Sequence, residues 1–306
     1  CGELHAERNA IASLTESAEG ATLYVTLEPC CHYGKTPPCT EAILEQKIAR
    51  VVIGSRDPNP LVSGKGAAIL RAAGVRVEED FMREECDALN PVFFHYITKK
   101  TPYVVMKYAM TADGKIAART GDSKWITGES ARKKVQELRH RYMGIMAGIG
   151  TVLADDPMLN VRIPGLKSPV RIICDSGLRI PMDSKIVKTA KEYRTIVAYA
   201  GEHSGEGCKE TEEKEEQLHT AGVETVSVPD ADGRVDLRKL MEYLGKQGID
   251  SVLLEGGGTL NDAALSAGIV NEICAFIAPK IFGGAGAKTP VSGIGVAHPA
   301  EAVKLT

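Results

Sequence analysis

The sequence of 306 residues predicts an α/β protein with two domains. Short apolar runs with the composition of strands alternate with segments of helical periodicity, which is typical of sheets covered by helices. A hydrophobic content of 43% suffices for two ordinary cores. Residues 98–102 form a short polar stretch that ends in proline, and we place the boundary there, between domains at 1–100 and 101–306.

The elements expected in the first domain are short. Apolar residues at helical spacing after His5 predict a helix whose first turn holds His5 and Glu7. Residues 22–27 alternate as a strand that leads to Cys30, and the Pro-Pro pair before Cys39 is typical of a helix start. The remaining expected elements are a strand at 50–54, a helix at 66–73, a strand at 75–78 and a helix at 82–97 interrupted near Pro91.

One imidazole, two thiols and one carboxylate fall within this region, on His5, Cys30, Cys39 and Glu7. Three protein ligands leave one position of a tetrahedral Zn²⁺ open for water, and the metal lowers the pKa of that water to about 7. Glu7, two residues after the histidine, is suited to moving protons, as the free carboxylate does in zinc deaminases. The spacing therefore predicts a deaminase-type zinc centre with Glu7 as its catalytic residue.

The distance between the two cysteines leaves an alternative open. Eight residues separate Cys30 from Cys39, whereas the commonest deaminase signature has two. The alternative is a chance cluster, or a closed structural zinc site with Cys31 or His32 as its fourth ligand. A structural site does not require the carboxylate of Glu7, which favours the catalytic interpretation.

The second domain is expected to begin with a strand that carries Lys107 and Ala109. A helix carrying Arg139 follows the only tryptophan, Trp125. By default a strand lysine is a solvated group and a single tryptophan belongs to the core. Residues 144–157 predict a strand, a glycine turn and a helix, but they lack the third glycine of a Rossmann fingerprint.

A second glycine turn lies further along, where a strand at 251–255 runs into glycines 256–258 and a helix through Leu265. Backbone amides at a glycine-rich helix start can bind an anion, and consecutive glycines let a phosphate approach closely. The alternative is a tight turn that binds nothing. Glu255 would be costly to bury without a partner, so we expect a ligand hydroxyl or amine to contact it.

The composition limits the kinds of partner that we expect this protein to bind. A net charge of −3 and an aromatic content of 5% argue against nucleic acid, and no apolar run is long enough to cross a membrane. Isolated cysteines such as Cys174 and Cys274 are typical of reduced core residues, so we expect a cytoplasmic protein. The charge run at 209–216 predicts a solvated helix face, and residues 302–306 predict the beginning of a strand.

Several motifs resemble the deaminase half of the bifunctional deaminase/reductase family of riboflavin biosynthesis. They are His5-Ala6-Glu7, Thr26-Leu27-Glu28-Pro29-Cys30, His32, Gly34 and Thr36-Pro37-Pro38-Cys39. The long insert between the cysteines separates that family from nucleoside and tRNA deaminases, and the resemblance continues through the rest of the chain. It implies a cytidine-deaminase-like α/β sandwich followed by a dihydrofolate-reductase-like α/β domain. Because the family has a helix and a strand hairpin before its His-Ala-Glu helix, we expect an N-terminally incomplete deaminase domain.

The resemblance also implies chemistry and site residues. Zn²⁺ would serve the deamination of a small molecule, 2,5-diamino-6-ribosylamino-pyrimidinone 5′-phosphate, and NADPH would then reduce its ribosyl chain to ribityl, in a homo-oligomer. Positions that match the family's substrate contacts are Ser123, Arg139, Leu159, Glu255 and Arg162, the last as candidate clamp for the ribose phosphate. Positions that match its cofactor contacts are Lys107, Ala109, Trp125, Thr151, Asp155, Ser176, Gly257, Gly258, Thr259 and Leu260.

Three other functions are compatible with the sequence. The chain could be a reductase with a truncated, inactive deaminase domain, or a metal-stabilised scaffold whose second domain only binds nucleotides. It could also be a nucleoside or nucleic-acid deaminase joined to a nucleotide-binding domain. That last function predicts a basic surface with base-stacking aromatics, which the acidic, aromatic-poor composition does not favour.

Overall fold

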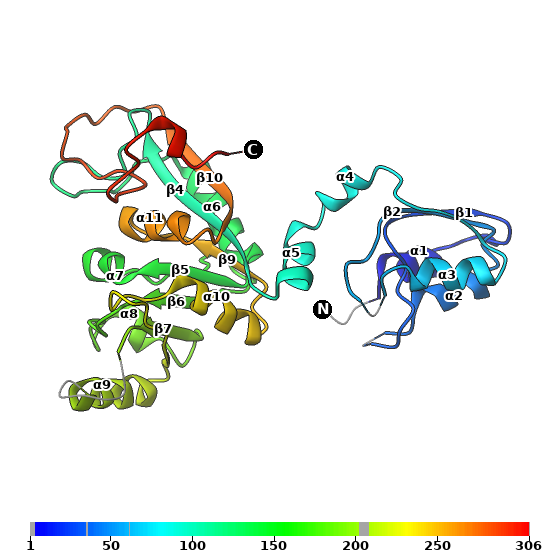
Figure 1. The fold of residues 1–306 in the computed structure, drawn as a ribbon, viewed down its shortest axis with the longest axis horizontal. Coiled ribbons are helices and arrows are strands. Elements are labelled where there is room, and N and C mark those ends of the chain that lie inside the picture. Colours follow the sequence, from blue (N-terminus) through cyan, green and yellow to red (C-terminus); the bar gives the residue numbers. More distant parts are fainter. Residues whose placement is uncertain (1–3, 35, 61, 202–207, 306) are drawn as a thin grey trace. The chain divides into compact units, whose positions relative to one another are not determined.

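The computed structural model describes residues 4–34, 36–60, 62–201 and 208–305. The chain divides into two compact units, Cys1–Lys99 and Lys100–Thr306. Each unit contains one parallel β-sheet with helices between its strands, so the predicted α/β class is confirmed for both (Figure 1).

The first unit alternates short helices and strands. Its elements are α1 (Ala6–Ala12), β1 (Thr22–Leu27), α2 (Cys39–Glu45), β2 (Arg50–Ser55), α3 (Lys65–Ala72), β3 (Arg76–Glu78), α4 (Arg83–Asp87) and α5 (Pro91–Lys99). The sheet has the order β1-β2-β3, and the central strand β2 is the most buried of the three. Ile43 of α2, Ile53 of β2 and Leu70 of α3 are fully buried and form the core between sheet and helices.

The second unit contains a larger sheet. Its elements are β4 (Tyr103–Thr111), α6 (Glu129–Arg141), β5 (Gly144–Gly148), α7 (Ile149–Asp155), β6 (Val170–Cys174), α8 (Lys185–Lys188), β7 (Thr195–Tyr199), α9 (Cys208–Thr220), β8 (Glu224–Ser227), α10 (Leu237–Lys246), β9 (Ser251–Leu254), α11 (Gly258–Ser266), β10 (Val270–Ala278) and the 3₁₀ turn η1 (Pro299–Glu301). The strand order is β10-β4-β9-β5-β6-β7-β8, and every pairing is parallel. β9, although late in the chain, therefore lies between β4 and β5 (Figure 1).

Both faces of the larger sheet are buried. Met146 belongs to one core cluster, whereas its neighbours Ile145 and Ala147 belong to the other, because successive side chains of a strand point to opposite faces. Such double coverage explains why the inner strands β5, β6 and β9 are rich in apolar residues, whereas the edge strand β10 is partly exposed. All strands of a parallel sheet end at one edge, so the turns after β4, β5, β6 and β9 share that edge, where ligands of open α/β sheets bind.

Most expected elements are present, with small differences. The helix predicted at 82–97 is indeed interrupted and forms α4 and α5, the second beginning at Pro91, where a proline is tolerated. The charge run at 209–216 lies in α9 and is largely exposed, as expected. The prediction of a strand from residue 302 is wrong for residues 302–305. Their apolar side chains are exposed, and they pair with no strand among the described residues. No helix of the described residues has the length and apolar character needed to span a bilayer.

Candidate active sites

The start of α1 places the histidine and the glutamate. His5 is the extended N-cap residue of α1, and Glu7 lies in the first helical turn. Arg8 of the same turn donates from Nε to the Pro37 carbonyl (3.0 Å) and from Nη2 to the Pro38 carbonyl (2.7 Å). Because Cys39 is the first residue of α2, these two hydrogen bonds hold the starts of α1 and α2 together.

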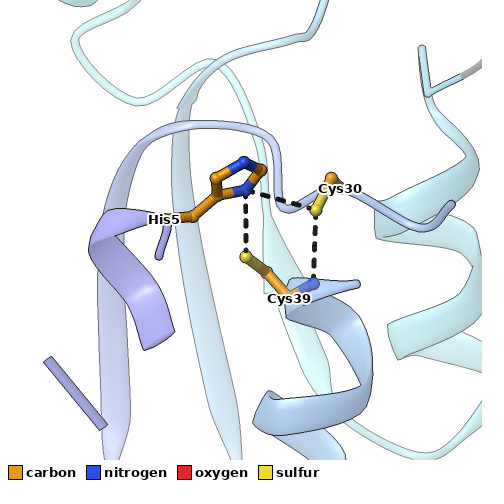
Figure 2. Close-up of side chains that lie close together, drawn as sticks. All are labelled: His5, Cys30 and Cys39. Atoms are coloured by element: carbon orange, nitrogen blue, oxygen red, sulfur yellow. Dashed lines mark hydrogen bonds between the residues drawn. The ribbon is translucent and has the colours of Figure 1, made fainter. Parts of the chain in front are cut away.

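Three potential metal ligands meet between these helix starts (Figure 2). His5 Nδ1 lies 3.4 Å from Cys30 Sγ and 3.4 Å from Cys39 Sγ, and the three ligand atoms are all within 4.8 Å of one another. Tetrahedral zinc with Zn–S near 2.3 Å and Zn–N near 2.0–2.1 Å separates such atoms by about 3.5 Å. The donor set and its spacing therefore fit zinc. Among the described residues the group has three members, so Cys31 and His32 do not complete a closed four-ligand site.

Contacts among the ligands shift the pKa values of the two thiols in opposite directions. The Cys39 side chain, helped by the Cys39 backbone N–H (3.3 Å from Cys30 Sγ) and by His5, lowers the pKa of Cys30 to about 5 against the opposing effect of burial. The same contact with Cys30, burial and the Glu7 carboxylate raise the pKa of Cys39. One thiolate is thus favoured before any cation binds, and the effect of Glu7 on Cys39 places its carboxylate beside the ligand cluster.

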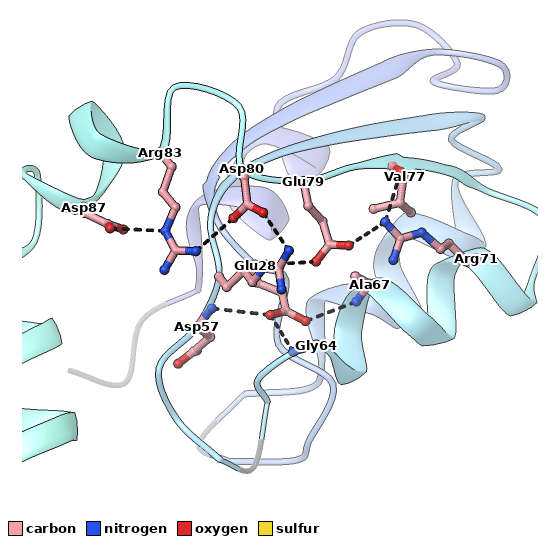
Figure 3. A network of polar contacts seen from close by, with 11 residues as sticks. Glu28, Asp57, Gly64, Ala67, Arg71, Val77, Glu79, Asp80, Arg83 and Asp87 are labelled. Atoms are coloured by element: carbon pink, nitrogen blue, oxygen red, sulfur yellow. Dashed lines mark hydrogen bonds and ion pairs between the residues drawn. The ribbon is translucent and has the colours of Figure 1, made fainter.

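A buried carboxylate anchors the turn that carries Cys30 (Figure 3). Glu28 is 3% exposed; its Oε2 accepts from the backbone N–H of Gly64 (2.9 Å) and Asp57 (3.4 Å), and its Oε1 from that of Ala67 (3.2 Å). A Cβ at position 66 would collide with the Pro29 carbonyl oxygen, so the turn also packs directly on the first residues of α3. Sequence reasoning treated Glu28 only as part of a motif; an acid that directly follows a strand was the available signal.

Exposed ion pairs surround this anchor without sharing its carboxylate. Arg56 contacts Glu79 and Asp80. Arg83 bridges Asp80 and Asp87 (Figure 3). The side chains of Arg56, Asp80, Arg83 and Asp87 keep substantial solvent access, so the ion pairs among them contribute little to stability. Glu28 is the group that fixes the Cys30 turn.

In the second unit, strand register brings three charged side chains together. Met106 pairs with Leu254, so the next residues along β4 and β9 are Lys107 and Glu255. Lys107 Nζ lies 3.2 Å from Glu255 Oε2, and Arg139 of α6 forms a bidentate pair with the same carboxylate at 2.7 and 3.0 Å. The three side chains are only 10–13% exposed.

This cluster explains how Lys107 and Glu255 are buried. Lys107 is not a solvated strand lysine, because it is paired with Glu255. Glu255 meets two cations of the protein, and its contact with a ligand stays a prediction. Burial alone would raise the pKa of Glu255, but Lys107 and Arg139 outweigh it and lower that pKa to about 2. Glu255 is therefore ionised at neutral pH, and its charge orients the two cations at the ligand-binding edge of the sheet.

α6 also holds the segment that carries Arg162. Arg139 Nη1 donates to the Asn160 carbonyl at 3.1 Å, and the Arg162 backbone N–H donates to Gln136 Oε1 at 2.8 Å. The Arg162 side chain is exposed. The backbone of this segment is thus fixed while the guanidinium is left accessible to a ligand.

The glycine turn before α11 has two distinct roles. Gly257 is the N-cap of α11 and offers no side-chain cap, so the first backbone N–H groups of the helix stay available. A Cβ at Gly257 would lie 3.8 Å from Thr151 Oγ1, which brings two matched cofactor positions side by side. At Gly258, however, a Cβ would collide with Ser292 and with the Thr289 carbonyl. The chain at 289–292 therefore requires a glycine here, and the expected approach of a phosphate to this turn stays a prediction.

The other matched positions are spread more widely. Trp125 is 59% exposed and stacks under Arg132 at 4.6 Å, so the core expectation for this tryptophan is wrong. Ser176 Oγ accepts from the Val235 N–H at 3.2 Å, and the Leu159 side chain is 3% exposed within the core. The remaining positions are Ala109, Ser123 and Leu260, which are half-buried, and Asp155 and Thr259, which are exposed.

Comparison with known proteins gives the class of each unit. Residues 2–55 match the family model for the cytidine and deoxycytidylate deaminase zinc-binding region, so the first unit carries the zinc region of a deaminase. Residues 102–306 match the model for the RibD C-terminal domain, which excludes an unrelated nucleotide-binding domain. The chain belongs to the RibD family, and the resemblance drawn from its motifs is confirmed.

Individual relatives agree with this assignment. A riboflavin biosynthesis protein RibD from Actinobacillus pleuropneumoniae is 56% identical over 304 residues, 99% of this chain and 79% of that protein. The solved structure of Acinetobacter baumannii RibD matches with 35% identity and a TM-score of 0.83, covering 99% of this chain and 81% of that one. A diaminohydroxyphosphoribosylaminopyrimidine deaminase/5-amino-6-(5-phosphoribosylamino)uracil reductase from Thermotoga maritima matches with 39% identity and a TM-score of 0.79, covering 96% and 79%.

Proposed function

We infer that this chain is a bifunctional enzyme of riboflavin biosynthesis. Its first unit deaminates the diaminopyrimidine ribosyl phosphate, and its second unit reduces the ribosyl chain with NADPH. The observation that carries the inference is the meeting of His5, Cys30 and Cys39 beside Glu7, in a chain whose second unit is a RibD reductase domain. A scaffold that only binds metal would not need Glu7 next to the ligands.

In the deaminase half, His5, Cys30 and Cys39 hold zinc. Bound zinc supplies the Lewis acidity that activates water at neutral pH. Glu7 takes a proton from the attacking water and delivers it to the departing amine, which leaves as ammonia. Arg8 and Glu28 keep the ligands in register by holding α1 against the 37–38 turn and the Cys30 turn against α3.

In the reductase half, the chain's residues mainly position two reactants. Bound NADPH supplies the hydride. The Glu255 carboxylate holds Lys107 and Arg139 at the edge of the sheet, and Arg162 binds the substrate phosphate with its exposed guanidinium. Backbone amides at the start of α11 bind a cofactor phosphate beside Thr151. Correct placement supplies most of the rate in such a reaction.

Further cofactor and substrate contacts follow the family pattern. They are substrate contacts at Ser123 and Leu159, the latter through its backbone because its side chain is buried, and cofactor contacts at Ala109, Trp125, Asp155, Ser176, Gly257, Gly258, Thr259 and Leu260.

The proposal includes a small-molecule substrate, no nucleic-acid partner, a homo-oligomer and a cytoplasmic location. The net charge of −3 supports the absence of a nucleic-acid partner. Cys174 and Cys274 are free thiols, as in a reducing compartment. Sedimentation of the purified protein measures its assembly.

Three measurements on one preparation test the function. We expect bound zinc, ammonia release from the diamino substrate, and NADPH oxidation with the deaminated product. Removing zinc with a chelator should abolish ammonia release and leave NADPH oxidation with the deaminated product unchanged. Oxidation without ammonia release from the zinc-loaded protein would instead identify a reductase with an inactive deaminase unit.

A further inference from the structure

Arg171 is a fully buried cation in β6 that neither proposed reaction uses. Within the described part of the chain it forms no ion pair, and its guanidinium is satisfied by neutral oxygens alone. Its acceptors are Thr195 Oγ1 (3.0 Å from Nε and 2.7 Å from Nη2), Thr189 Oγ1 (2.9 Å from Nη1), and the carbonyls of Met158 (3.3 Å from Nη1), Ile186 (2.8 Å from Nη2) and Tyr193 (3.1 Å from Nη2).

Burying a charge without a counter-ion costs free energy. We therefore expect Arg171 to have a role that offsets this cost. Desolvation lowers the pKa of Arg171 to about 10, which still leaves the guanidinium protonated at neutral pH. The three carbonyls belong to the turn after α7, to α8 and to the turn before β7. Arg171 is therefore the point at which three separate chain segments are joined by charge-assisted hydrogen bonds.

The turn after α7 needs such support because its backbone is strained. Asp156 has a φ of 39° and Leu159 has a φ of 49°. Both values lie in the left-handed region, which residues other than glycine rarely adopt. Strained residues persist only when surrounding contacts hold them. Here the Asp156 carboxylate accepts from the Lys185 backbone N–H at 2.8 Å, Leu159 is buried, and Arg171 holds the Met158 carbonyl between them.

The turn at Met158 is important for function because of the residues on either side of it. Met158 lies between Asp155 and Arg162, the residues assigned above to cofactor and substrate. Beyond the turn the backbone of residue 162 is already fixed to α6. A displacement of the Met158 carbonyl would therefore change the separation of the two binding residues, and misplacement by about 1 Å can cost a hundredfold in rate.

We propose that Arg171 is a positioning residue of the reductase: by holding the Met158 carbonyl from within the core, it sets the turn that presents Asp155 and Arg162 to their ligands. This inference rests on the proposed function. Arg171 itself cannot touch substrate, because none of its surface is exposed.

The first test is Arg171→Lys, which keeps the charge but cannot reach acceptors on three segments at once. We expect the KM of the reductase for its deaminated substrate to rise at least about tenfold, with ammonia release unchanged as an internal control for the amount of enzyme. A purely structural role would lower the folded fraction and the apparent kcat at unchanged KM. Unchanged KM in folded Arg171→Lys would overturn the proposal.

A matched control removes Arg171 contacts on the side away from the turn. Thr195→Val deletes the acceptor of Nε and Nη2 and leaves the Met158 bond in place. It should lower the melting temperature without changing the reductase KM. A KM increase equal to that of Arg171→Lys would show that general loosening, and not the Met158 bond, is responsible.

The exposed side of the same turn gives a second variant that does not disturb the core. Asp156→Ala removes the bond from the Lys185 N–H, whereas Asp156→Asn keeps an acceptor oxygen there. We expect Asp156→Ala to raise the KM for the substrate. Asp156→Asn should keep this KM near the wild-type value. If Arg171→Lys does not fold, an unchanged KM in Asp156→Ala still overturns the proposal.

Arg162→Ala separates this inference from the function on which it rests. If Arg162→Ala leaves the substrate KM unchanged, the assignment of Arg162 to the phosphate fails and the positioning argument fails with it. If Arg162→Ala raises KM while Arg171→Lys and Asp156→Ala do not, only the positioning role is lost.

Discussion

Glu28 in the first unit and Arg171 in the second are buried charges of opposite sign, and neither has an ion pair among the described residues. Glu28 accepts from three backbone N–H groups, and Arg171 donates to three backbone carbonyls. Glu28 anchors a cysteine two residues along the chain, whereas Arg171 anchors the turn at Met158, which lies in the connection between α7 and β6. The zinc ligands His5 and Cys39 are 34 positions apart, but Glu255 meets Arg139 and Lys107 from 116 and 148 positions away. The zinc site is therefore organised over a shorter stretch of the chain than the reductase site.

If the zinc site is organised locally, a substitution in it should abolish deamination without affecting the second unit. Glu7→Gln removes the proton-transferring group, so we expect ammonia release to fall roughly 10²- to 10⁴-fold while zinc stays bound and NADPH oxidation is unchanged. Activity assays with metal analysis check this. Glu16→Gln, at an exposed acid of the same unit, is the control. Loss of zinc in Glu7→Gln would show that the carboxylate is structural.

A site assembled across the fold should lose stability when its central charge is removed. Glu255→Gln leaves Lys107 and Arg139 buried without their anion, so we expect the second unit to be destabilised by about 3–5 kcal/mol and NADPH oxidation to be lost. Thermal unfolding, with exposed Glu242→Gln as control, measures this.

The same carboxylate predicts a pH dependence. The folded-state pKa of Glu255, about 2, is below its ordinary value of about 4.3. Its contribution is therefore complete above pH ~4.3 and is lost as the pH falls toward 2. Glu255→Gln should lack this acid-range decline, and an unchanged decline would assign it to other groups.

The hydrogen bonds of Glu28 can be weakened without changing the shape of its side chain. Glu28→Gln sets an amide NH₂ against backbone N–H donors, so the Cys30 turn should lose its register. We expect zinc affinity to fall about 10- to 100-fold, as when supporting groups of a metal site are changed. Competition with a chelator measures the affinity, and cobalt substitution reports the ligand geometry by its absorption. Wild-type affinity would leave the turn fixed by packing at Gly66 alone.

The smallest effect is expected at the bond between the two helix starts. Arg8→Ala removes two hydrogen bonds to the 37–38 turn, in a place where water can replace them. Each is worth about 0.5 kcal/mol where water can replace it, the low end of the usual range, so zinc affinity should fall about tenfold or less. Lys47→Ala, which breaks only an exposed ion pair, is the control. A loss larger than that of Glu28→Gln would reverse the order of the two anchors.

Sequence reasoning succeeded where the determining contacts are short in range. The helix after His5, the strand at 22–27 and the helix at Cys39 follow from periodicity and proline placement, and together they bring the three ligands into one region. It could not predict the pairing of Lys107 with Glu255, because the strands that lead to them are adjacent in the sheet but remote in the chain. It also missed Arg171, because an arginine inside an apolar strand gives no indication of which carbonyls surround it.

The sequence by itself determined the α/β class, the residues of the zinc centre and the family, since apolar periodicity and motif spacing are properties of neighbouring residues. Only the tertiary structure decided that Glu255 meets Lys107 and Arg139, that Gly258 is needed by the chain at 289–292, and that Arg171 supports the turn at Met158. The physical reason is the strand order. Inserting β9 between β4 and β5 creates neighbours more than a hundred residues apart, and no local pattern specifies that insertion.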